Sequence, residues 1–102
     1  MARVARLQEL IRREVNVVLR NEIRDARLAG VSITMVELAA DGSRARLWYS
    51  ADDDREEVLE GVGGLLRSRI AEGLGLKRTP EVRFRRDPAT RTFGEALAME
   101  EE

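Results

Sequence analysis

The sequence predicts a single α+β domain in which helices cover one face of a three-stranded sheet. Its predicted elements follow the order helix, strand, strand, helix, glycine corner, helix, strand. The chain has 102 residues, and a chain of this length buries only about two thirds of its unfolded surface, so a second core is not expected. Alanine and the aliphatic residues dominate the apolar set, and the aromatic residues are Trp48, Tyr49, Phe84 and Phe93. Such a core is thin and suits one sheet with helices on one side.

Residues 3 to about 24 are expected to form the first helix. Apolar side chains recur there at three- and four-residue steps and share one face: Val4, Leu7, Ile11, Val15 and Val18. The roughly opposite side carries arginines: Arg6, Arg13, Arg20 and Arg24. This cationic side either binds a polyanion or is a solvated face that keeps the helix soluble. Glu9 and Glu14 interrupt the charge and leave both interpretations open.

Two alternating stretches predict a hairpin. Residues 31–38 and 44–50 have strand patterns, and Asp41-Gly42 between them is a turn signal. In the second stretch, small or apolar residues alternate with Arg44, Arg46 and Trp48, so the open face of the hairpin is expected to show them. On that face Trp48 either stacks on a nucleic-acid base or is covered by the C-terminal tail.

A glycine corner interrupts the second helical region. Residues 52–54 are aspartates that offer N-caps, and an apolar helical face follows them. Gly61, Gly63 and Gly64 then come within four positions, each costing up to ~1 kcal/mol relative to alanine inside a helix. They imply either a bend that lets two helices pack closely or a backbone surface that approaches phosphates. In the second case the corner opens the N-terminus of a helix that carries Arg67.

A basic loop leads into the last predicted strand, at residues 82–85. Lys77 and Arg78 lie in this loop and belong either to a binding surface or to a solvated connection. Arg83 and Arg85 alternate with apolar residues, so they are expected to leave the packed face together.

Charge is segregated along the chain although the net charge is only −1. Residues 1–27 carry seven arginines against four acids, and residues 62–86 carry seven Lys or Arg against two acids. The other acids gather near residues 52–57 and at the C-terminus, which predicts a polarised surface. Residues 1–88 are expected to form the domain, and residues 89–102 a short, acidic and flexible tail.

The composition excludes several classes of protein. The chain has neither cysteine nor histidine, which removes disulfides, thiol nucleophiles, imidazole bases and most transition-metal ligands. The adjacent carboxylates of residues 52–54 have no base or nucleophile beside them, so helix capping explains them better than catalysis. No apolar run reaches the ~20 residues needed to cross a bilayer. We therefore expect a cytoplasmic protein that is not an enzyme and that carries no metal ion and no other cofactor.

The glycine corner and the basic loop resemble known RNA-binding proteins. A Gly-x-x-Gly corner followed by a helix resembles the element with which K-homology domains clamp a nucleic-acid backbone. Almost the whole chain resembles the ribosome-binding factor A family. The members of this family are bacterial assembly factors of the small ribosomal subunit. The resemblance is carried by residues 22–28, by residues 41–45 and above all by Leu-Lys-Arg-Thr-Pro-Glu-Val-Arg-Phe at residues 76–84, followed by Asp87.

Two positions depart from the pattern of that family. Ala26 stands where the family usually has proline, and Val62 stands where the family has the alanine of an Ala-x-Gly kink. The resemblance implies a K-homology-like fold of type II for this chain, and the departure at Val62 concerns how the kink of that fold is formed.

The resemblance implies a non-catalytic factor that binds the immature small ribosomal subunit and its ribosomal RNA as a monomer. It further implies a role in late maturation and processing of that RNA, near its end, and in adaptation to cold. The expected RNA-binding residues are Arg3, Arg6, Arg13, Arg20, Arg24, Arg27, Gly61, Gly63, Gly64, Arg67, Lys77, Arg78, Arg83 and Arg85. Two alternatives stay open: a general K-homology RNA-binding module without ribosome specificity, and a protein- or ligand-binding domain whose arginines only solubilise it.

Overall fold

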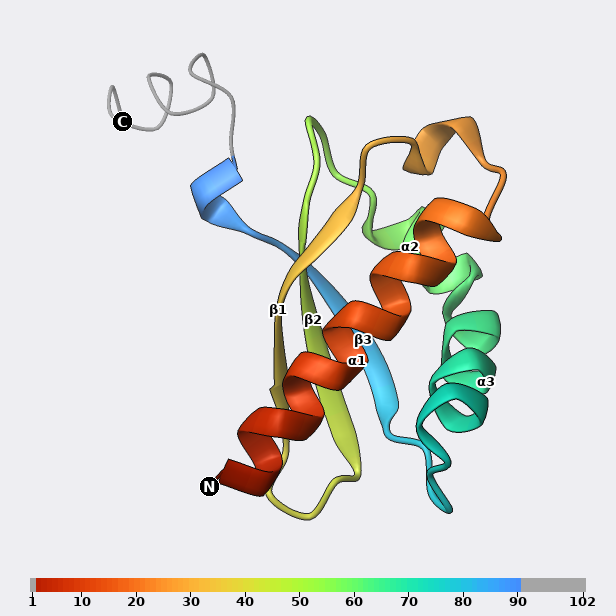
Figure 1. Ribbon diagram of the computed structural model, residues 1–102. Helices are drawn as coiled ribbons and strands as arrows, with labels where there is room; N and C mark the ends of the chain where they lie inside the picture. The colour runs from red at the N-terminus through yellow and green to blue at the C-terminus, as the bar shows by residue number, and fades with distance from the viewer. Residues whose placement is uncertain (1, 91–102) are drawn as a thin grey trace.

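The computed structural model describes residues 2–90 of the chain (Figure 1). In chain order the elements are helix α1 (Ala2–Asn21), the 3-10 turn η1 (Ala26–Leu28), strands β1 (Ser32–Leu38) and β2 (Arg44–Ser50), helices α2 (Glu56–Gly61) and α3 (Gly63–Leu74), strand β3 (Glu81–Arg86) and the 3-10 turn η2 (Pro88–Thr90). The predicted α+β class and the predicted order of helices and strands are confirmed.

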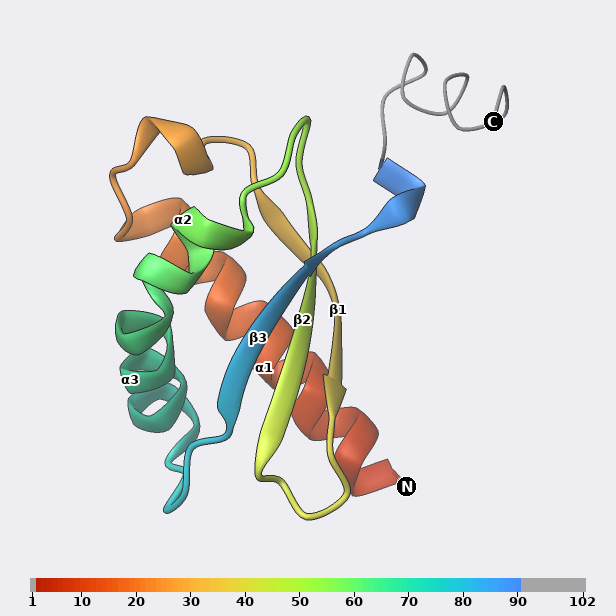
Figure 2. The ribbon, with the colours of Figure 1, turned by 180° about the vertical axis from the view of Figure 1, so that it is seen from behind.

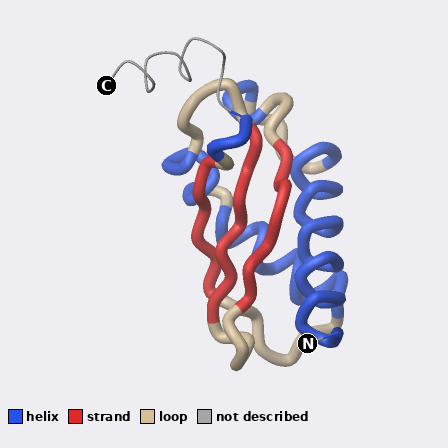
Figure 3. The backbone as a smooth tube through the Cα atoms, turned by 90° about the vertical axis from the view of Figure 1, so that its left-hand side faces the viewer, coloured by secondary structure: helices blue, strands red, loops and turns tan. Residues whose placement is uncertain are grey.

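The three strands form one sheet in the order β1-β2-β3. Strands β1 and β2 pair antiparallel as the predicted hairpin, and β2 and β3 pair parallel. A parallel pair needs a long crossover connection, which α2 and α3 provide (Figure 2). Figure 3 shows the three strands side by side, with the N-terminal helix α1 beside β1. Within residues 2–90, the opposite face of the sheet carries no helix.

Alternation along the strands separates the core from this open face. The side chains that point toward the helices are almost fully buried: Ile33, Val36, Ala45, Leu47, Tyr49 and Phe84. They meet the buried residues of the helices: Ile11, Val15, Val18, Leu19, Leu59, Leu66 and Ile70. In β1 the pairing with β2 shifts between Ile33 and Met35, and this bulge is why Ile33 and Val36 both face the core although they are three residues apart.

Helix α1 protects the outer edge of the sheet with two polar side chains. The Asn16 amide accepts from the Ile33 N–H at 2.7 Å and donates to the Ile33 carbonyl at 2.9 Å. The Gln8 side chain accepts from the Leu38 N–H at 2.9 Å. These bonds satisfy backbone groups of β1 that would otherwise be open to pairing with another chain.

The predicted ends of two helices are wrong by a few residues. Helix α1 ends at Asn21 rather than near residue 24, because the Ile23 N–H bonds the Val18 carbonyl and the chain then turns through η1, which buries Leu28. Helix α2 begins at Glu56 and has Arg55 at its N-cap position, without a side-chain cap. The aspartates of residues 52–54 therefore lie before the helix.

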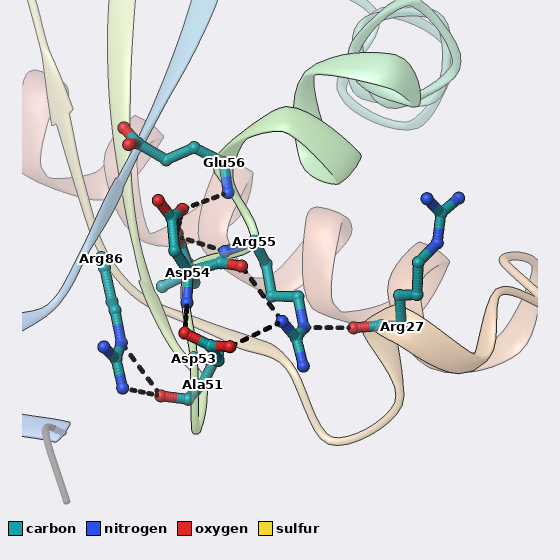
Figure 4. A network of polar contacts seen from close by, with 8 residues as sticks. Arg27, Ala51, Asp53, Asp54, Arg55, Glu56 and Arg86 are labelled. Carbon is teal, nitrogen blue, oxygen red and sulfur yellow. Dashed lines mark hydrogen bonds and ion pairs between the residues drawn. The ribbon is translucent and has the colours of Figure 1, made fainter.

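Asp54 instead closes the loop between β2 and α2 (Figure 4). Its Oδ1 atom accepts from the Glu56 N–H at 2.9 Å and from the Tyr49 hydroxyl at 3.1 Å. That hydroxyl also accepts from the Arg55 N–H at 2.8 Å. Burial raises the pKa of Tyr49, which keeps the hydroxyl protonated and able to donate. The loop also holds Arg86, whose guanidinium donates to the Ala51 carbonyl at 2.9 Å.

Asp54 is expected to make stability depend on pH in the acid range. The hydrogen bond from the Glu56 N–H, followed by that from Tyr49, lowers the pKa of Asp54 from 3.8. A carboxylate whose pKa is lowered by folding stabilises the fold above its unfolded pKa, and this contribution disappears as the pH falls through the folded pKa. Asp54→Ala should therefore lower the free energy of unfolding by about 1 kcal/mol at pH 7, and by less below pH ~3.8.

Urea denaturation of both proteins between pH 7 and pH 2.5 measures this difference. Asp52→Ala is the matched control, because the structure gives the Asp52 side chain no hydrogen bond within the described residues. A difference between wild type and Asp54→Ala that stays constant down to pH 2.5 would show that the Asp54 charge does not stabilise the loop.

The described part of the chain contains no helix that is long and apolar enough to cross a membrane. The predicted tail at residues 89–102 lies outside the described residues except for its first two positions, so the boundary after residue 88 stays a prediction.

Candidate nucleic-acid interface

Seven cationic side chains extend from the loop before β3 onto the open face of the sheet. One shallow hollow is lined by the cations Arg44, Arg67, Lys77 and Arg78 together with Glu81. A second is lined by Arg44, Arg46, Arg83 and Arg85 together with the carboxylates of Glu37, Glu60 and Glu81. Both hollows include Arg44 and Glu81, so they are continuous. We call this set of seven residues the basic strip: Arg44, Arg46, Arg67, Lys77, Arg78, Arg83 and Arg85.

The register of the sheet brings the arginines of the strip together. In the parallel pair, Arg46 of β2 lies opposite Arg83 of β3, while Arg44 lies opposite Glu81. Like charges that face each other across a strand pair destabilise the sheet. The Arg46–Arg83 pair therefore does not help the fold, and an anion bound between these two side chains would relieve their repulsion.

Four members of the strip form no ion pair among residues 2–90, although Arg44 is near enough to Asp41 to help lower the pKa of that carboxyl. Within these described residues, no ion pair or side-chain hydrogen bond is formed by the following residues: Arg44, Lys77, Arg78 and Arg83. Of the other members, Arg85 is paired with Glu56 at 2.8 Å, and Arg46 lies 3.9 Å from a Glu37 carboxylate oxygen. The four unpaired cations are available to phosphates, which guanidinium and ammonium groups bind through charge-assisted hydrogen bonds.

Arg67 has a positioning role in the strip. Its guanidinium donates to the carbonyls of Pro80 and Thr79, at 3.1 Å and 3.3 Å. These bonds tie α3 to the loop that carries Lys77 and Arg78. The predicted contact of Arg67 with RNA stays a prediction, and the structure adds that Arg67 holds the neighbouring cations in place.

The arginines of the first helical region form a separate cationic surface. Side chains without a partner among the described residues are Arg3, Arg6, Arg20 and Arg24. Arg13 lies 3.7 Å from a Glu9 oxygen, and Arg27 is held by two side-chain bonds to Asp25, at 2.7 Å and 3.0 Å. The Arg27 guanidinium lowers the pKa of Asp25. Because α1 and η1 belong to the helical side of the molecule, the structure does not join these arginines to the strip.

The glycine corner is also distant from the basic loop. Gly63 begins α3, and Lys77 follows its end, so a 12-residue helix of about 18 Å separates them. The hollow beside the corner is lined by two carboxylates, one cation and three uncharged residues: Asp25, Glu57, Arg27, Val58, Gly61 and Val62. This surrounding does not concentrate positive charge.

The glycines of the corner are not needed for close helix packing. A Cβ atom added at Gly61 or Gly64 would meet no atom within 4 Å, and one at Gly63 would only reach Phe84 at 4.0 Å. The closest approach lies at Gly73, where a Cβ would be 2.5 Å from a carboxylate oxygen at the movable end of the Glu14 side chain. The bend therefore has no steric requirement for glycine, while the contact with phosphate stays a prediction.

Gly64→Ala separates the two interpretations of the corner. Since the position is helical and has open space, alanine should raise the free energy of unfolding by about 0.5–1 kcal/mol, measured by urea denaturation. If the backbone of the corner approaches phosphate, the same methyl group should weaken RNA binding. Gly75→Ala is the control, because Gly75 has a φ of 62° and alanine there should cost about 1 kcal/mol. Destabilisation by Gly64→Ala would contradict this account.

Sequence reasoning left Arg44 and Arg46 out of the expected RNA-binding set. Their exposure followed from the alternation of the second strand and is confirmed, since Ala45 and Leu47 are buried. The missing information was the parallel neighbour: only the pairing of β2 with β3 places Arg46 beside Arg83. Alternating arginines on two strands of one sheet are the signal that could have indicated this surface.

Comparisons with known proteins agree on one family. The family model described as ribosome-binding factor A matches residues 3–98. The ribosome-binding factor A of Ruthia magnifica subsp. Calyptogena magnifica is 40% identical over 94 residues, which cover 88% of this chain and 84% of that relative.

Two structures of the Thermus thermophilus factor have a similar fold. The crystal structure of ribosome-binding factor A from this organism covers 81% of this chain and 94% of its own, with a TM-score of 0.75 and 21% identity. A homology model of the Thermus thermophilus factor, fitted into a cryo-EM map of a 30S complex, covers 86% of this chain and 99% of its own, with a TM-score of 0.73 and 21% identity. At this identity the likeness shows the fold, which is K-homology-like of type II as predicted.

Proposed function

Because the chain belongs to the ribosome-binding factor A family, whose members are non-catalytic assembly factors that bind the 30S subunit, we propose that it binds the immature small ribosomal subunit through its RNA. It thereby aids the late maturation and processing of that RNA. The Thermus thermophilus factor was fitted into a 30S complex, and this chain acts on the same kind of particle in the cytoplasm.

The observation that carries the proposal is the set of unpaired cations on the basic strip. Arg44, Lys77, Arg78 and Arg83 are held by three different segments of the chain and border two connected hollows. RNA phosphates bound there release counterions, so the affinity falls as the salt concentration rises. For each phosphate contacted, a tenfold rise in salt lowers the binding constant by nearly tenfold. The strip is therefore the principal RNA contact of this protein.

Binding is stoichiometric, because the chain holds or stabilises an RNA conformation without changing a covalent bond. The arginines on α1 form a second, smaller contact in this proposal. Apart from Glu56, which pairs with Arg85 of the strip, the acidic residues at positions 52–57 face away from the RNA and limit binding to other polyanions. The protein acts as a monomer in this proposal, because the large apolar side chains exposed within residues 2–90 are scattered over different elements: Val17, Met35 and Leu65.

Sedimentation with purified ribosomal particles tests the proposal. At moderate salt the protein should travel with small subunits and their precursors and remain unbound in the presence of large subunits. Equal binding to both particles would indicate a general RNA-binding module, and binding to neither would indicate a domain whose arginines only solubilise it. Each of these two results contradicts the proposal.

A further inference from the structure

Trp48 lies on the open face of the sheet at the far end of the basic strip. Leu47 and Tyr49, the residues on either side of it in β2, are fully buried, whereas Trp48 keeps a minor part of its surface exposed. It lies opposite Met35 of β1 and Arg85 of β3 in the strand register. The Met35 side chain is 48% exposed, so an apolar area with an indole ring sits among arginines.

The indole ring is held in place by polar contacts. Its Nε1 atom donates to Glu37 Oε1 at 2.5 Å, and the Arg46 guanidinium carbon lies 5.9 Å from the ring centroid. The same Glu37 carboxylate is within 3.9 Å of Arg46. Glu37 therefore orients both groups and lowers the conformational entropy that either would lose on binding a ligand.

From this arrangement we propose that the open face binds an unpaired RNA segment, with a base stacked against Trp48 and its backbone phosphates on Arg46 and Arg83. This rests on the proposed function and names the class of RNA that the strip takes. Aromatic rings stack on bases of any sequence, and arginines beside them bind the phosphates. In a duplex the faces of the bases are covered by their neighbours, so a ring on the surface of a sheet can stack only on unpaired nucleotides.

The charges around the ring favour RNA over an apolar partner. Arg46, Arg83 and Arg85 surround Trp48 in the register of the sheet, and among the described contacts only Arg85 is closely paired with a carboxylate. An apolar partner would have to cover these guanidinium groups without offering them acceptors, which carries a large desolvation cost. An anionic chain with flat bases satisfies both the cations and the ring.

Fluorescence titration tests the proposal directly, because Trp48 is the only tryptophan of the chain. The full-length protein is titrated with an unpaired uridine octamer, with an abasic RNA backbone of the same length, and with a short RNA duplex. The octamer should quench Trp48 emission and bind at least about fivefold more tightly than the abasic backbone. The duplex should leave the emission nearly unchanged.

Two substitutions separate stacking from structure. Trp48→Leu should weaken binding of the octamer by at least about fivefold, measured by fluorescence anisotropy of a labelled RNA, while Trp48→Phe should retain most of the affinity. Binding of the abasic backbone should be the same in both variants. Arg69→Ala is the control, because Arg69 pairs with Glu22 on the helical side, and it should not change Trp48 quenching.

Three results would overturn the proposal. These are equal affinity for the octamer and the abasic backbone, equal affinity of Trp48→Leu and Trp48→Phe, and an emission that saturating octamer leaves unchanged, as a ring covered by residues 91–102 would give. If any of them occurs while the protein still sediments with small subunits, the stacking site is wrong and the proposed function stands. Failure of sedimentation contradicts the proposed function itself.

Discussion

Reversal of three charges on the basic strip should lower the affinity for small ribosomal subunits by about a hundredfold at 0.1 M salt. The triple variant is Lys77→Glu, Arg78→Glu and Arg83→Glu, in which the new carboxylate at position 83 lies opposite Arg46. Each cation loses a charge-assisted contact of about 1 kcal/mol or more, and the new carboxylates repel phosphate. None of the three side chains has an ion pair within the described residues, so the fold should survive, as circular dichroism and urea denaturation can check.

The control for this variant reverses three charges on the other cationic surface. Arg3→Glu, Arg6→Glu and Arg24→Glu change the net charge by the same amount but leave the strip intact. Sedimentation at several salt concentrations should show a weaker salt dependence for the strip variant, because fewer phosphates are contacted. A loss of affinity that is as large in the control as in the strip variant would refute the strip as the principal contact.

Leu66→Ala should lower the free energy of unfolding by about 3 kcal/mol. Leu66 is fully buried in α3, and truncation of a buried leucine loses its transfer free energy and leaves a cavity, at a cost of about 2–5 kcal/mol. A domain of this size has only about 5–15 kcal/mol in total, so the midpoint of urea denaturation should fall strongly. Arg67 connects α3 to the basic loop. RNA binding measured at urea concentrations near the new midpoint should therefore fall together with the fraction of folded protein.

Leu65→Ala is the matched control for the buried position. Leu65 precedes Leu66 in the same helix and is 38% exposed, so its truncation should change the free energy of unfolding by only about 0.5 kcal/mol. Equal effects of the two substitutions would show that α3 does not pack on the sheet as described.

Alternation was sufficient for the inward and outward sides of β2, but it did not predict the bulge in β1 or the ends of the helices. Alternation in residues 44–50 predicted which side chains enter the core, because the two-residue period is strict in a strand. The end of α1 depends on a bond between Ile23 and Val18 and on the burial of Leu28. These are tertiary effects that apolar spacing does not encode.

The members of the candidate site were largely predictable as exposed cations, but their grouping was not. Lys77, Arg78, Arg83 and Arg85 lie where the alternation and the basic loop placed them. Whether they join Arg44 or the arginines of α1 depends on which strand β3 pairs with. The role of the glycine corner in RNA binding stays a prediction. Its acidic neighbours, Asp25 before η1 and Glu57 of α2, are brought beside it only by the fold.

Cleavage of ribosomal RNA from a tethered iron chelate tests the central claim most directly. The chain has no cysteine, so Glu81→Cys, which lies in both hollows of the strip, and Val17→Cys, which is exposed on α1, each provide a single attachment point. Hydroxyl radicals generated on the small subunit should cut its RNA strongly from position 81 and weakly from position 17. Strong cuts from position 17 with none from position 81 would contradict the account.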